Sequence, residues 1–412
     1  MTRDGNGTRF TRRSLLRTGG VATLGTAALA GCLGDDDGDP DELTIGALQP
    51  LSGGFAAWGQ AHEAGLEFAV EEINDEGGVL GRDLVVETTD TGSDAGEADT
   101  VFRRFVERDD AVAITGPVSS DVGLRTRQTA EELAVPLLLH MAGSHTILPK
   151  DTRYTFRIGS QPAVSDVLPQ IELIEDRGYD TVGAVIGDYE WGNTLEASLE
   201  ALIPDGVELE TATAPVNEDD FTPFLRDLPG DLDLLVATGH PPGSIAIHNQ
   251  ALEIGLDPEL TTGAGLPPNV LASGLGENAM EGFLHLHVSD PFGEAFGTVA
   301  ERFVDARDER FDTHEAYGYL TGQLIATAAE EAGEADPVAI ADAIRGIELD
   351  TLLAEPLRYT EWGELAGFRH MLSGFEAGAP DYYPEGDWRL TEVVRSTPLD
   401  GFDPDEYDFI EN

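Results

Sequence analysis

The chain has 412 residues, which is enough for two or three domains with cores of their own. Its 24 lysines and arginines are outnumbered by 78 aspartates and glutamates, the formal net charge is −54, and Lys150 is the only lysine. A field of this sign repels phosphate backbones and anionic lipids, which argues against nucleic-acid binding and against a function at a charged membrane surface. With 41% hydrophobic residues, the composition is that of a folded protein rather than a disordered one.

The acidic charge is typical of adaptation to molar salt. At that ionic strength the Debye length falls to about 3 Å, so self-repulsion that would swell the chain in dilute buffer is screened. We therefore interpret the charge as the mark of a halophile. It says where the protein works and little about what it does.

Residues 1–31 predict a twin-arginine lipoprotein signal peptide rather than a folded element. A pair of arginines at 12–13 precedes a weakly apolar stretch at 21–30, which is too short to span a bilayer. The run Leu29-Ala30-Gly31-Cys32 resembles a lipobox, in which the cysteine becomes the lipidated first residue. Cys32 is the only cysteine, so no intrachain disulfide can form.

Residues 32–42 are rich in aspartate and glycine and predict a flexible acidic tether. We therefore expect a globular body at the outer face of the cell membrane, attached to the membrane by its lipid anchor only.

From Leu43 onward, short apolar runs alternate with longer amphipathic segments. The spacing of the apolar residues predicts strands at 43–48, 82–89, 111–115 and 136–139. Between them it predicts helices at 61–73, 97–108 and 119–134. This alternation is typical of βαβ units with a parallel sheet.

After the stretch 154–159 the alternation starts afresh, which predicts a second sheet and hence two α/β lobes. The expected strands are 181–186, 207–212, 233–237, 260–263 and 282–287, and the expected helices are 167–177, 194–202, 221–228 and 244–254. Three further helices are expected at 295–311, 315–332 and 337–344, followed by strands within 357–375 around a turn at Trp362-Gly363. The acidic tail 396–412 has little to pack.

Loops that leave the strands of such sheets are where ligands bind. The loop 49–59 follows the first strand, and its Trp58 either covers a ligand or caps the core. Ser119 and Ser120 follow another strand and open a helix, where a serine caps the helix and the free N–H groups can hold a carboxylate. The loop 140–145 is expected beside them and would add backbone donors.

Several of these segments resemble the leucine/isoleucine/valine-binding family of ABC-transporter solute receptors. The resemblance covers about residues 43–390, and its most specific part is INDEGGVLGR at 73–82. The other matching motifs are PLSG at 50–53, GPVSS at 116–120, YTFR at 154–157, Trp191-Gly192, Asp220-Phe221, Glu281-Gly282-Phe283, Ala316-Tyr317 and Glu355-Pro356-Leu357.

The resemblance implies two Rossmann-like lobes with parallel sheets, joined by three crossover strands. Lobe 1 would comprise 43–157 with 286–354, and lobe 2 would comprise 158–285 with 355–395. In that family the lobes close on a solute and the complex docks on a membrane permease. It implies a monomeric, non-enzymatic receptor for a small solute, with an amino acid as the first expectation for the ligand.

The family's ligand contacts transfer residue by residue. Trp58 stands where the family has an aromatic side chain over the ligand, and Ser119 or Ser120 stands where a serine holds the ligand carboxylate. Ala142-Gly143 replaces an Ala-Thr pair, so the threonine hydroxyl is absent. Trp191 replaces a tyrosine, and His240 falls where another ligand-facing residue is common.

The run Gly263-Ala264-Gly265-Leu266 departs from the family, which often carries there an acid that pairs the ligand ammonium. Leu266 remains a candidate ligand contact. Because an unpaired buried ammonium costs several kcal/mol, either Asp188, Glu190 or another acid substitutes, or the ligand has no ammonium. Urea, short amides and aromatic carboxylates are therefore alternatives. Two tryptophans in the cleft would favour a flat or apolar body, or a cation over the rings.

Other patterns offer no competing chemistry. His285 and His287 alternate on a strand but make an incomplete zinc site, and we expect polar exposure for them and no metal. No G-x-S-x-G, P-loop or G-x-G-x-x-G motif supports a hydrolase, NTPase or dinucleotide-binding enzyme, so no cofactor is expected. A ligand-sensing module of a signalling system is the alternative from another class, and a secreted enzyme is the third.

Overall fold

The structure is a computed structural model that describes residues 42–412, except 240–242, 384–385, 408 and 411–412. The predicted signal peptide, Cys32 and the tether up to residue 41 lie outside the described residues, as does His240. Glu42, expected in the tether, already begins the first strand. No helix among the described residues is long and apolar enough to cross a membrane.

The first sheet is entirely parallel and has the order β2-β1-β3-β4-β5. Its strands are β1 (Glu42–Gln49), β2 (Asp83–Asp90), β3 (Ala113–Thr115), β4 (Leu137–Leu139) and β5 (Thr155–Arg157). The crossover helices are α1 (Ala56–Asp75), α2 (Ala95–Glu107) and α3 (Ser120–Leu133). Alternation along β1 buries both faces: Ile45 packs in the cluster that includes α1, and Leu48 packs in the one that includes α2 and α3.

The second sheet has the order β12-β11-β10-β9-β8-β6-β7 and is antiparallel only where β11 pairs with β10 and β12. Its strands are β6 (Thr181–Gly187), β7 (Glu208–Ala214), β8 (Leu234–Thr238), β9 (Leu260–Gly263), β10 (Phe283–His287), β11 (Met371–Ala377) and β12 (Trp388–Arg395). The accompanying helices are α4 (Ala163–Arg177), α5 (Glu190–Leu202), α6 (Thr222–Leu225), α7 (Gly243–Glu253) and α8 (Pro268–Leu275).

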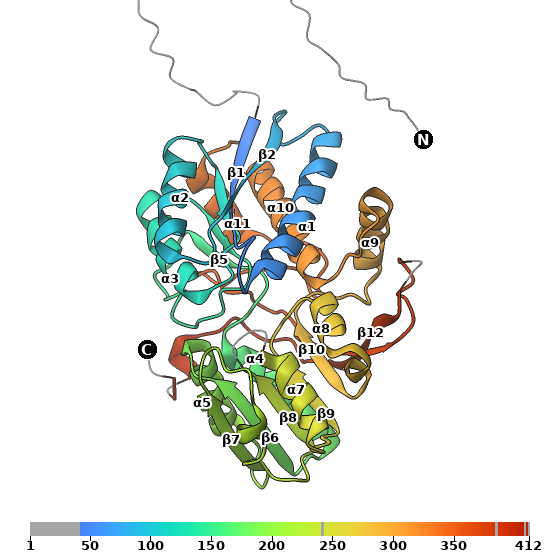
Figure 1. Ribbon diagram of the computed structural model, residues 1–412. Helices are drawn as coiled ribbons and strands as arrows, with labels where there is room; N and C mark the ends of the chain where they lie inside the picture. Colours follow the sequence, from blue (N-terminus) through green and yellow to red (C-terminus); the bar gives the residue numbers. More distant parts are fainter. Residues whose placement is uncertain (1–41, 240–242, 384–385, 408, 411–412) are drawn as a thin grey trace, which may run out of the picture. The chain divides into compact units, whose positions relative to one another are not determined.

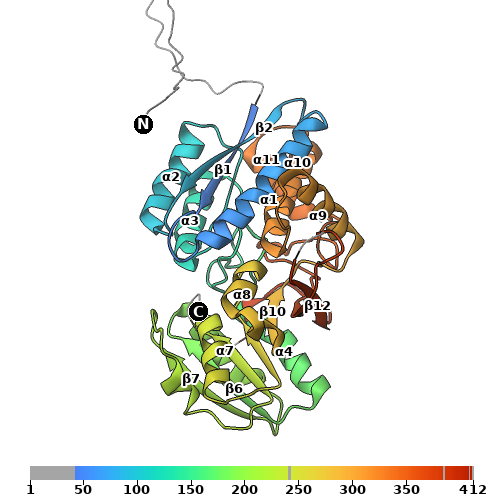
Figure 2. The same ribbon diagram turned by 45° about the vertical axis from the view of Figure 1, so that its right-hand side comes forward.

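Three later helices, α9 (Glu294–Arg307), α10 (Thr313–Ala332) and α11 (Pro337–Gly346), return to the side of the first sheet. A capping box between Asp312 and Glu315 starts α10. Figures 1 and 2 show α1 and α10 side by side, although their first residues are 257 positions apart in the sequence. We call the first sheet with α1–α3 and α9–α11 lobe 1, and the second sheet with α4–α8 lobe 2.

The chain passes between the two sheets three times, at 158–162, 288–293 and 347–370. The predicted fold class, two Rossmann-like α/β lobes joined by three crossovers, is confirmed. Each crossover passes the pocket described below, so movement of one lobe against the other would act on that pocket.

The structure differs from the sequence-based expectation in four places. The helix expected at 221–228 is the short α6, and α8 and β12 were not predicted. Within 357–375 the turn at Trp362-Gly363 is flanked by a single bridge between Tyr359 and Leu365, and the regular strand is β11.

The acidic tail was expected to have little to pack, and this is also wrong. Phe402 is 3% exposed and packs in one cluster with Val164 of α4 and Ile410. Lys150, the only lysine, pairs with Asp403 and Asp405 at 2.6 and 2.5 Å. The tail therefore contacts both lobes, because Val164 belongs to lobe 2 and Lys150 follows β4 of lobe 1.

Candidate ligand-binding site

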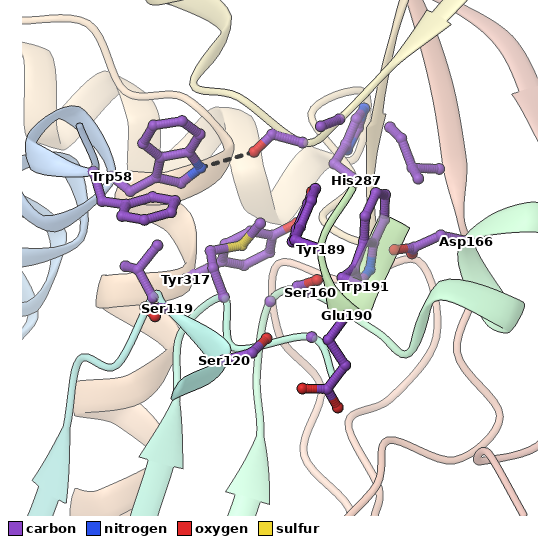
Figure 3. Close-up of a pocket in the computed structure, with 18 of the residues that line it drawn as sticks. Trp58, Ser119, Ser120, Ser160, Asp166, Tyr189, Glu190, Trp191, His287 and Tyr317 are labelled. Atoms are coloured by element: carbon purple, nitrogen blue, oxygen red, sulfur yellow. Dashed lines mark hydrogen bonds between the residues drawn. The ribbon is translucent and has the colours of Figure 1, made fainter. Parts of the chain in front are cut away.

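A pocket of about 330 Å³ lies between the two lobes. From lobe 1 it takes residues that follow β1, β3 and β4, and from lobe 2 it takes residues that follow β6 and β9. These are the carboxyl ends of parallel strands, where open α/β sheets bind ligands. Figure 3 shows the labelled side chains converging on this space.

The amino-terminal end of α3 forms one wall of the pocket. Ser119 and Ser120 follow Gly116 at the end of β3, and both line the cavity. Ser119 occupies the capping position, but its side chain makes no capping hydrogen bond, contrary to the expectation that one of the two serines caps the helix. Ser120 Oγ instead accepts a hydrogen bond of 3.1 Å from Ser144 N. The N–H groups of this first turn and the helix dipole favour an anionic ligand group.

Aromatic side chains cover much of the remaining wall. Phe55 and Trp58 meet edge to face at 5.5 Å, and Tyr189 stacks on Trp191 at 6.2 Å. Tyr317 of α10 also lines the cavity, and its buried hydroxyl accepts a hydrogen bond of 3.0 Å from Val288 N. Such walls suit a flat or apolar ligand body.

Gly143 and Trp191 depend on each other. A Cβ built on Gly143 would lie 2.7 Å from Ser160 Oγ and 3.3 Å from Trp191 Cδ1. A threonine at this position would therefore push against the indole. The glycine at 143 thus leaves the space that the indole of Trp191 occupies.

Two carboxyl groups of lobe 2 line the pocket in different environments. Glu190 starts α5, is exposed, and accepts hydrogen bonds from Ser144 Oγ and Thr146 Oγ1 of lobe 1. Asp166 of α4 is buried, and burial raises its pKa well above the ordinary value. Arg157 and the indole N–H of Trp191 lower that pKa, but burial has the larger effect.

The structure brings together five of the eight predicted ligand contacts: Trp58, Ser119, Ser120, Gly143 and Trp191 all line the pocket. Ala142 and Leu266 are fully buried and do not line it. Ala142 packs in the core around α2 and α3, and Leu266 packs against α8. Of the acids considered as substitutes, Glu190 lines the pocket and Asp188 does not.

Sequence reasoning missed Asp166, Tyr189, Tyr317, His287 and His370, which also line the pocket. No ligand contact was predicted for the Ala316-Tyr317 motif. For His285 and His287 the predicted polar exposure is wrong. Both histidines are buried rather than exposed, and their rings stack at 4.7 Å. No group of three or more potential metal ligands occurs among the residues described.

The fold and this pocket are those of a two-lobed solute-binding protein. A family model described as periplasmic binding protein matches residues 42–367, and the chain belongs to that family. The chain is 27% identical over 310 residues to the Leu/Ile/Val-binding protein homolog 2 of Brucella abortus, covering 74% of this chain and 82% of that protein.

Solved structures show the same fold. The branched-chain amino acid transporter substrate-binding protein LivJ of Streptococcus pneumoniae, in complex with isoleucine, superposes with a TM-score of 0.72 at 19% identity, covering 85% of this chain and 100% of that one. A solute-binding protein of an ABC transporter from Rhodopseudomonas palustris, in complex with 3,4-dihydroxybenzoic acid, has a TM-score of 0.73 at 19% identity, covering 89% and 99%.

Proposed function

We propose that this chain is the extracytoplasmic substrate-binding lipoprotein of an ABC importer. It captures a small solute between lobe 1 (43–157 with 286–354) and lobe 2 (158–285 with 355–395) and delivers it, as a monomer, to the permease. A lipid on Cys32 after twin-arginine export would keep it at the outer face of the membrane. The acidic surface suits work in molar salt.

The observation that carries the proposal is the pocket between the lobes, with its aromatic walls and the start of α3. Trp58 and Trp191 would enclose the ligand body, and Ser119, Ser120 and the backbone at Gly143 would hold a ligand carboxylate. A branched-chain or other amino acid is the first candidate, in line with the Leu/Ile/Val-binding protein homolog of Brucella abortus and the isoleucine complex of the Streptococcus pneumoniae protein.

An aromatic carboxylate is the second candidate ligand. Gly143 leaves room for the indole of Trp191 at the pocket wall, and the Rhodopseudomonas protein holds a dihydroxybenzoate. Urea and short amides remain alternatives on the same ground. A sensory module with the same fold is the alternative from another class, and adjacent permease and ATPase genes would favour transport.

A thermal-shift panel on the full chain in molar KCl tests the proposal. The ligands are branched-chain, polar and aromatic amino acids, benzoates, urea and short amides. A ligand at 100 times its dissociation constant adds about 2.7 kcal/mol to the free energy of unfolding, which raises the melting temperature measurably. If no solute shifts the melting temperature at millimolar concentration, the receptor function is wrong.

A further inference from the structure

One corner of the pocket carries a buried acid beside a buried imidazole. Asp166 lies in the first turn of α4, and His370 directly precedes β11. Both line the cavity, although only 5% of Asp166 and 1% of His370 is exposed. Asp166 Oδ1 lies 3.4 Å from His370 Nε2. Both titratable side chains therefore face the cavity, and they lie close enough together to hydrogen-bond to the same small ligand group.

His370 has unused hydrogen-bonding capacity. Among the described residues neither ring nitrogen has a close side-chain partner: Asp166 Oδ1 lies 3.4 Å from Nε2, and a backbone hydrogen bond with His287 raises the pKa of the ring. Burial, with a smaller effect of His287, lowers the pKa of His370 to about 3, so the ring is neutral and one nitrogen is an acceptor. By contrast, both ring nitrogens of His287 are engaged, by Ser289 O at 2.9 Å and Ser373 Oγ at 2.8 Å.

No group that faces this pair supplies a free positive charge. Arg157 is the cation that acts on Asp166, and its guanidinium already makes two hydrogen bonds to Glu364, of 2.6 and 2.9 Å. The other titratable groups that act on the pair are Tyr189, Tyr317 and His287. None of these three carries a positive charge at neutral pH, so a buried carboxylate here lacks a full counter-charge.

We infer that Asp166 and His370 form the subsite for an ammonium group of the ligand, and that a proton leaves Asp166 when such a ligand binds. The inference rests on the proposed function. Burial raises the pKa of Asp166 and so favours its neutral carboxylic acid in the free protein. The incoming ammonium keeps its three hydrogens, the carboxyl proton passes to solvent, and the resulting carboxylate pairs with the ammonium, so charge and atoms balance.

The chemistry of this corner favours an ammonium over other groups. An ammonium has three donors and no acceptor, which matches the carboxylate of Asp166, one of whose oxygens also accepts from the Trp191 indole, and an acceptor nitrogen of His370. The stacked rings of Tyr189 and Trp191 add a surface that attracts cations. Figure 3 draws Ser119 on the left and Asp166 on the right, with Tyr317, Tyr189 and Trp191 between them in that view. The ammonium and the carboxylate of an α-amino acid share one carbon, so a zwitterion that reaches both Asp166 and α3 carries the two groups on different carbons.

Matched pairs of probes that differ only in the ammonium test the inference. They are 5-aminopentanoate with pentanoate, and 4-(aminomethyl)benzoate with 4-methylbenzoate, because in both amino acids the ammonium and the carboxylate are on different carbons. Calorimetric titration of the full chain in two buffers of different ionisation enthalpy counts the protons released. We expect the amino acids to bind with release of up to one proton per ligand, decreasing from pH 5 to pH 8, and their des-amino partners to bind without it.

Variants separate this subsite from the rest of the pocket. Asp166→Asn should weaken amino-acid binding at least 30-fold, abolish the proton release and leave des-amino binding within about threefold. His370→Asn should weaken the amino acids less. Asp188→Asn is the matched control, because Asp188 is exposed and does not line the pocket. This variant should change neither the affinity for the amino acids nor the proton release.

Three outcomes would overturn the inference. They are tighter binding of the des-amino acids than of the amino acids, no proton release at any pH between 5 and 8, and unchanged amino-acid affinity in Asp166→Asn. In each of these cases a ligand still binds between the lobes, so the proposed function stands. Absence of binding by all four probes and by every solute of the thermal-shift panel would instead overturn the proposed function, and the inference with it.

Discussion

The indole Nε1 of Trp58 donates a hydrogen bond of 2.9 Å to the backbone carbonyl of Gly265, 207 residues further along the chain. Trp58 belongs to α1 of lobe 1, and Gly265 follows β9 of lobe 2. Both residues line the pocket, and the tryptophan is only 4% exposed. One side chain thus forms a wall of the pocket and joins the lobes that enclose it.

Substitution of Trp58 should separate these two contributions. Trp58→Ala removes the wall and the hydrogen bond, so we expect no detectable ligand binding while the fold persists. Trp58→Phe keeps an aromatic ring and removes the hydrogen bond, which has a net value of about 1 kcal/mol, and should weaken binding roughly fivefold. Titration with whichever solute stabilises the wild type in the thermal-shift panel measures both effects.

Trp388→Phe is the control for this pair. Trp388 lies under the guanidinium of Arg310, 3.4 Å from its ring centroid, and does not line the pocket. Its replacement should leave affinity unchanged. Trp191→Ala, at the opposite wall, should abolish binding as Trp58→Ala does. Wild-type affinity in both alanine variants would show that the ligand binds elsewhere.

The crossing of α1 and α10 requires two glycines. A Cβ on Gly65 would lie 1.9 Å from Glu315 O, and a Cβ on Gly318 would lie 1.9 Å from His62 O. Both distances end on backbone atoms, so neither clash can be relieved by a side-chain rotation. We expect Gly65→Ala and Gly318→Ala each to lower the free energy of unfolding by about 3 kcal/mol, at the upper end of overpacking penalties.

Gly297 in α9 is the matched control, because a Cβ there meets no atom within 4 Å. Gly297→Ala should stabilise the protein by roughly 0.5–1 kcal/mol, since alanine has less backbone entropy to lose. Urea unfolding in molar KCl measures all three variants. A loss below about 1 kcal/mol in the two α1–α10 variants would mean that the helices can separate without cost.

These contacts mark the limit of what the sequence could show. The alternation of strands and helices predicts both sheets, because each strand–helix unit is defined locally. Trp58, Ser119 and Gly143 could be predicted because each lies in the segment that follows a strand or begins the next helix. Asp166 lies inside a helix, with no local signal that distinguishes it from a solvent-facing acid. Only the tertiary fold brings it to within 3.4 Å of His370, 204 positions away in the chain.

The missed packing of the C-terminal region has a similar cause. Phe402 stands alone among acidic residues, so no periodic pattern of apolar residues announces that it is buried. Its burial depends on Val164 of α4, which is far away in sequence. β12 was missed because none of its residues is buried and it pairs only with β11, at the edge of the sheet.

The buried pair of Arg157 and Glu364 should matter strongly for stability. Both side chains are fully buried, and the Nε–Oε2 distance is 2.6 Å. The guanidinium also donates to the backbone carbonyls of Ala142 and Ser144, next to the pocket wall at Gly143. Glu364→Ala leaves this cation buried without its partner, so we expect the free energy of unfolding to fall by about 3–5 kcal/mol, measured by urea unfolding in molar KCl.

Two further variants distinguish a lost ion pair from a lost contact. Arg157→Met combined with Glu364→Leu removes both charges and keeps apolar volume, so it should recover a large part of the lost stability. Arg345→Met removes the ion pair with Asp342, whose side chain is 71% exposed. It should lower the free energy of unfolding by less than about 1 kcal/mol. Equal losses in Glu364→Ala and in the double variant would show that the charges are not the reason.

Buried histidines should make the fold sensitive to acid. Burial lowers the pKa of His62 and His314 to about 3, and that of His287 to about 4. An unfolded histidine takes up a proton near pH 6.5, whereas the folded one stays neutral, so the unfolded state binds more protons below that pH. Stability is therefore retained above pH 6.5 and lost as the pH falls towards 3. Raised carboxyl pKa values, such as about 8 for Glu315, act in the opposite direction.

A single substitution isolates the contribution of one histidine. His62 contacts Gln49 Nε2 at 2.8 Å and Thr321 Oγ1 at 3.4 Å, and His62→Gln keeps a polar side chain there without the titration. Between pH 7.5 and pH 5 this variant should lose about 2 kcal/mol less stability than the wild type. Ser198→Ala, a buried change without a titrating group, should shift the urea midpoint by the same amount at both pH values. If His62→Gln and the wild type lose stability in parallel, His62 is protonated in the folded state, because an imidazole that ionises equally in both states cannot change the slope.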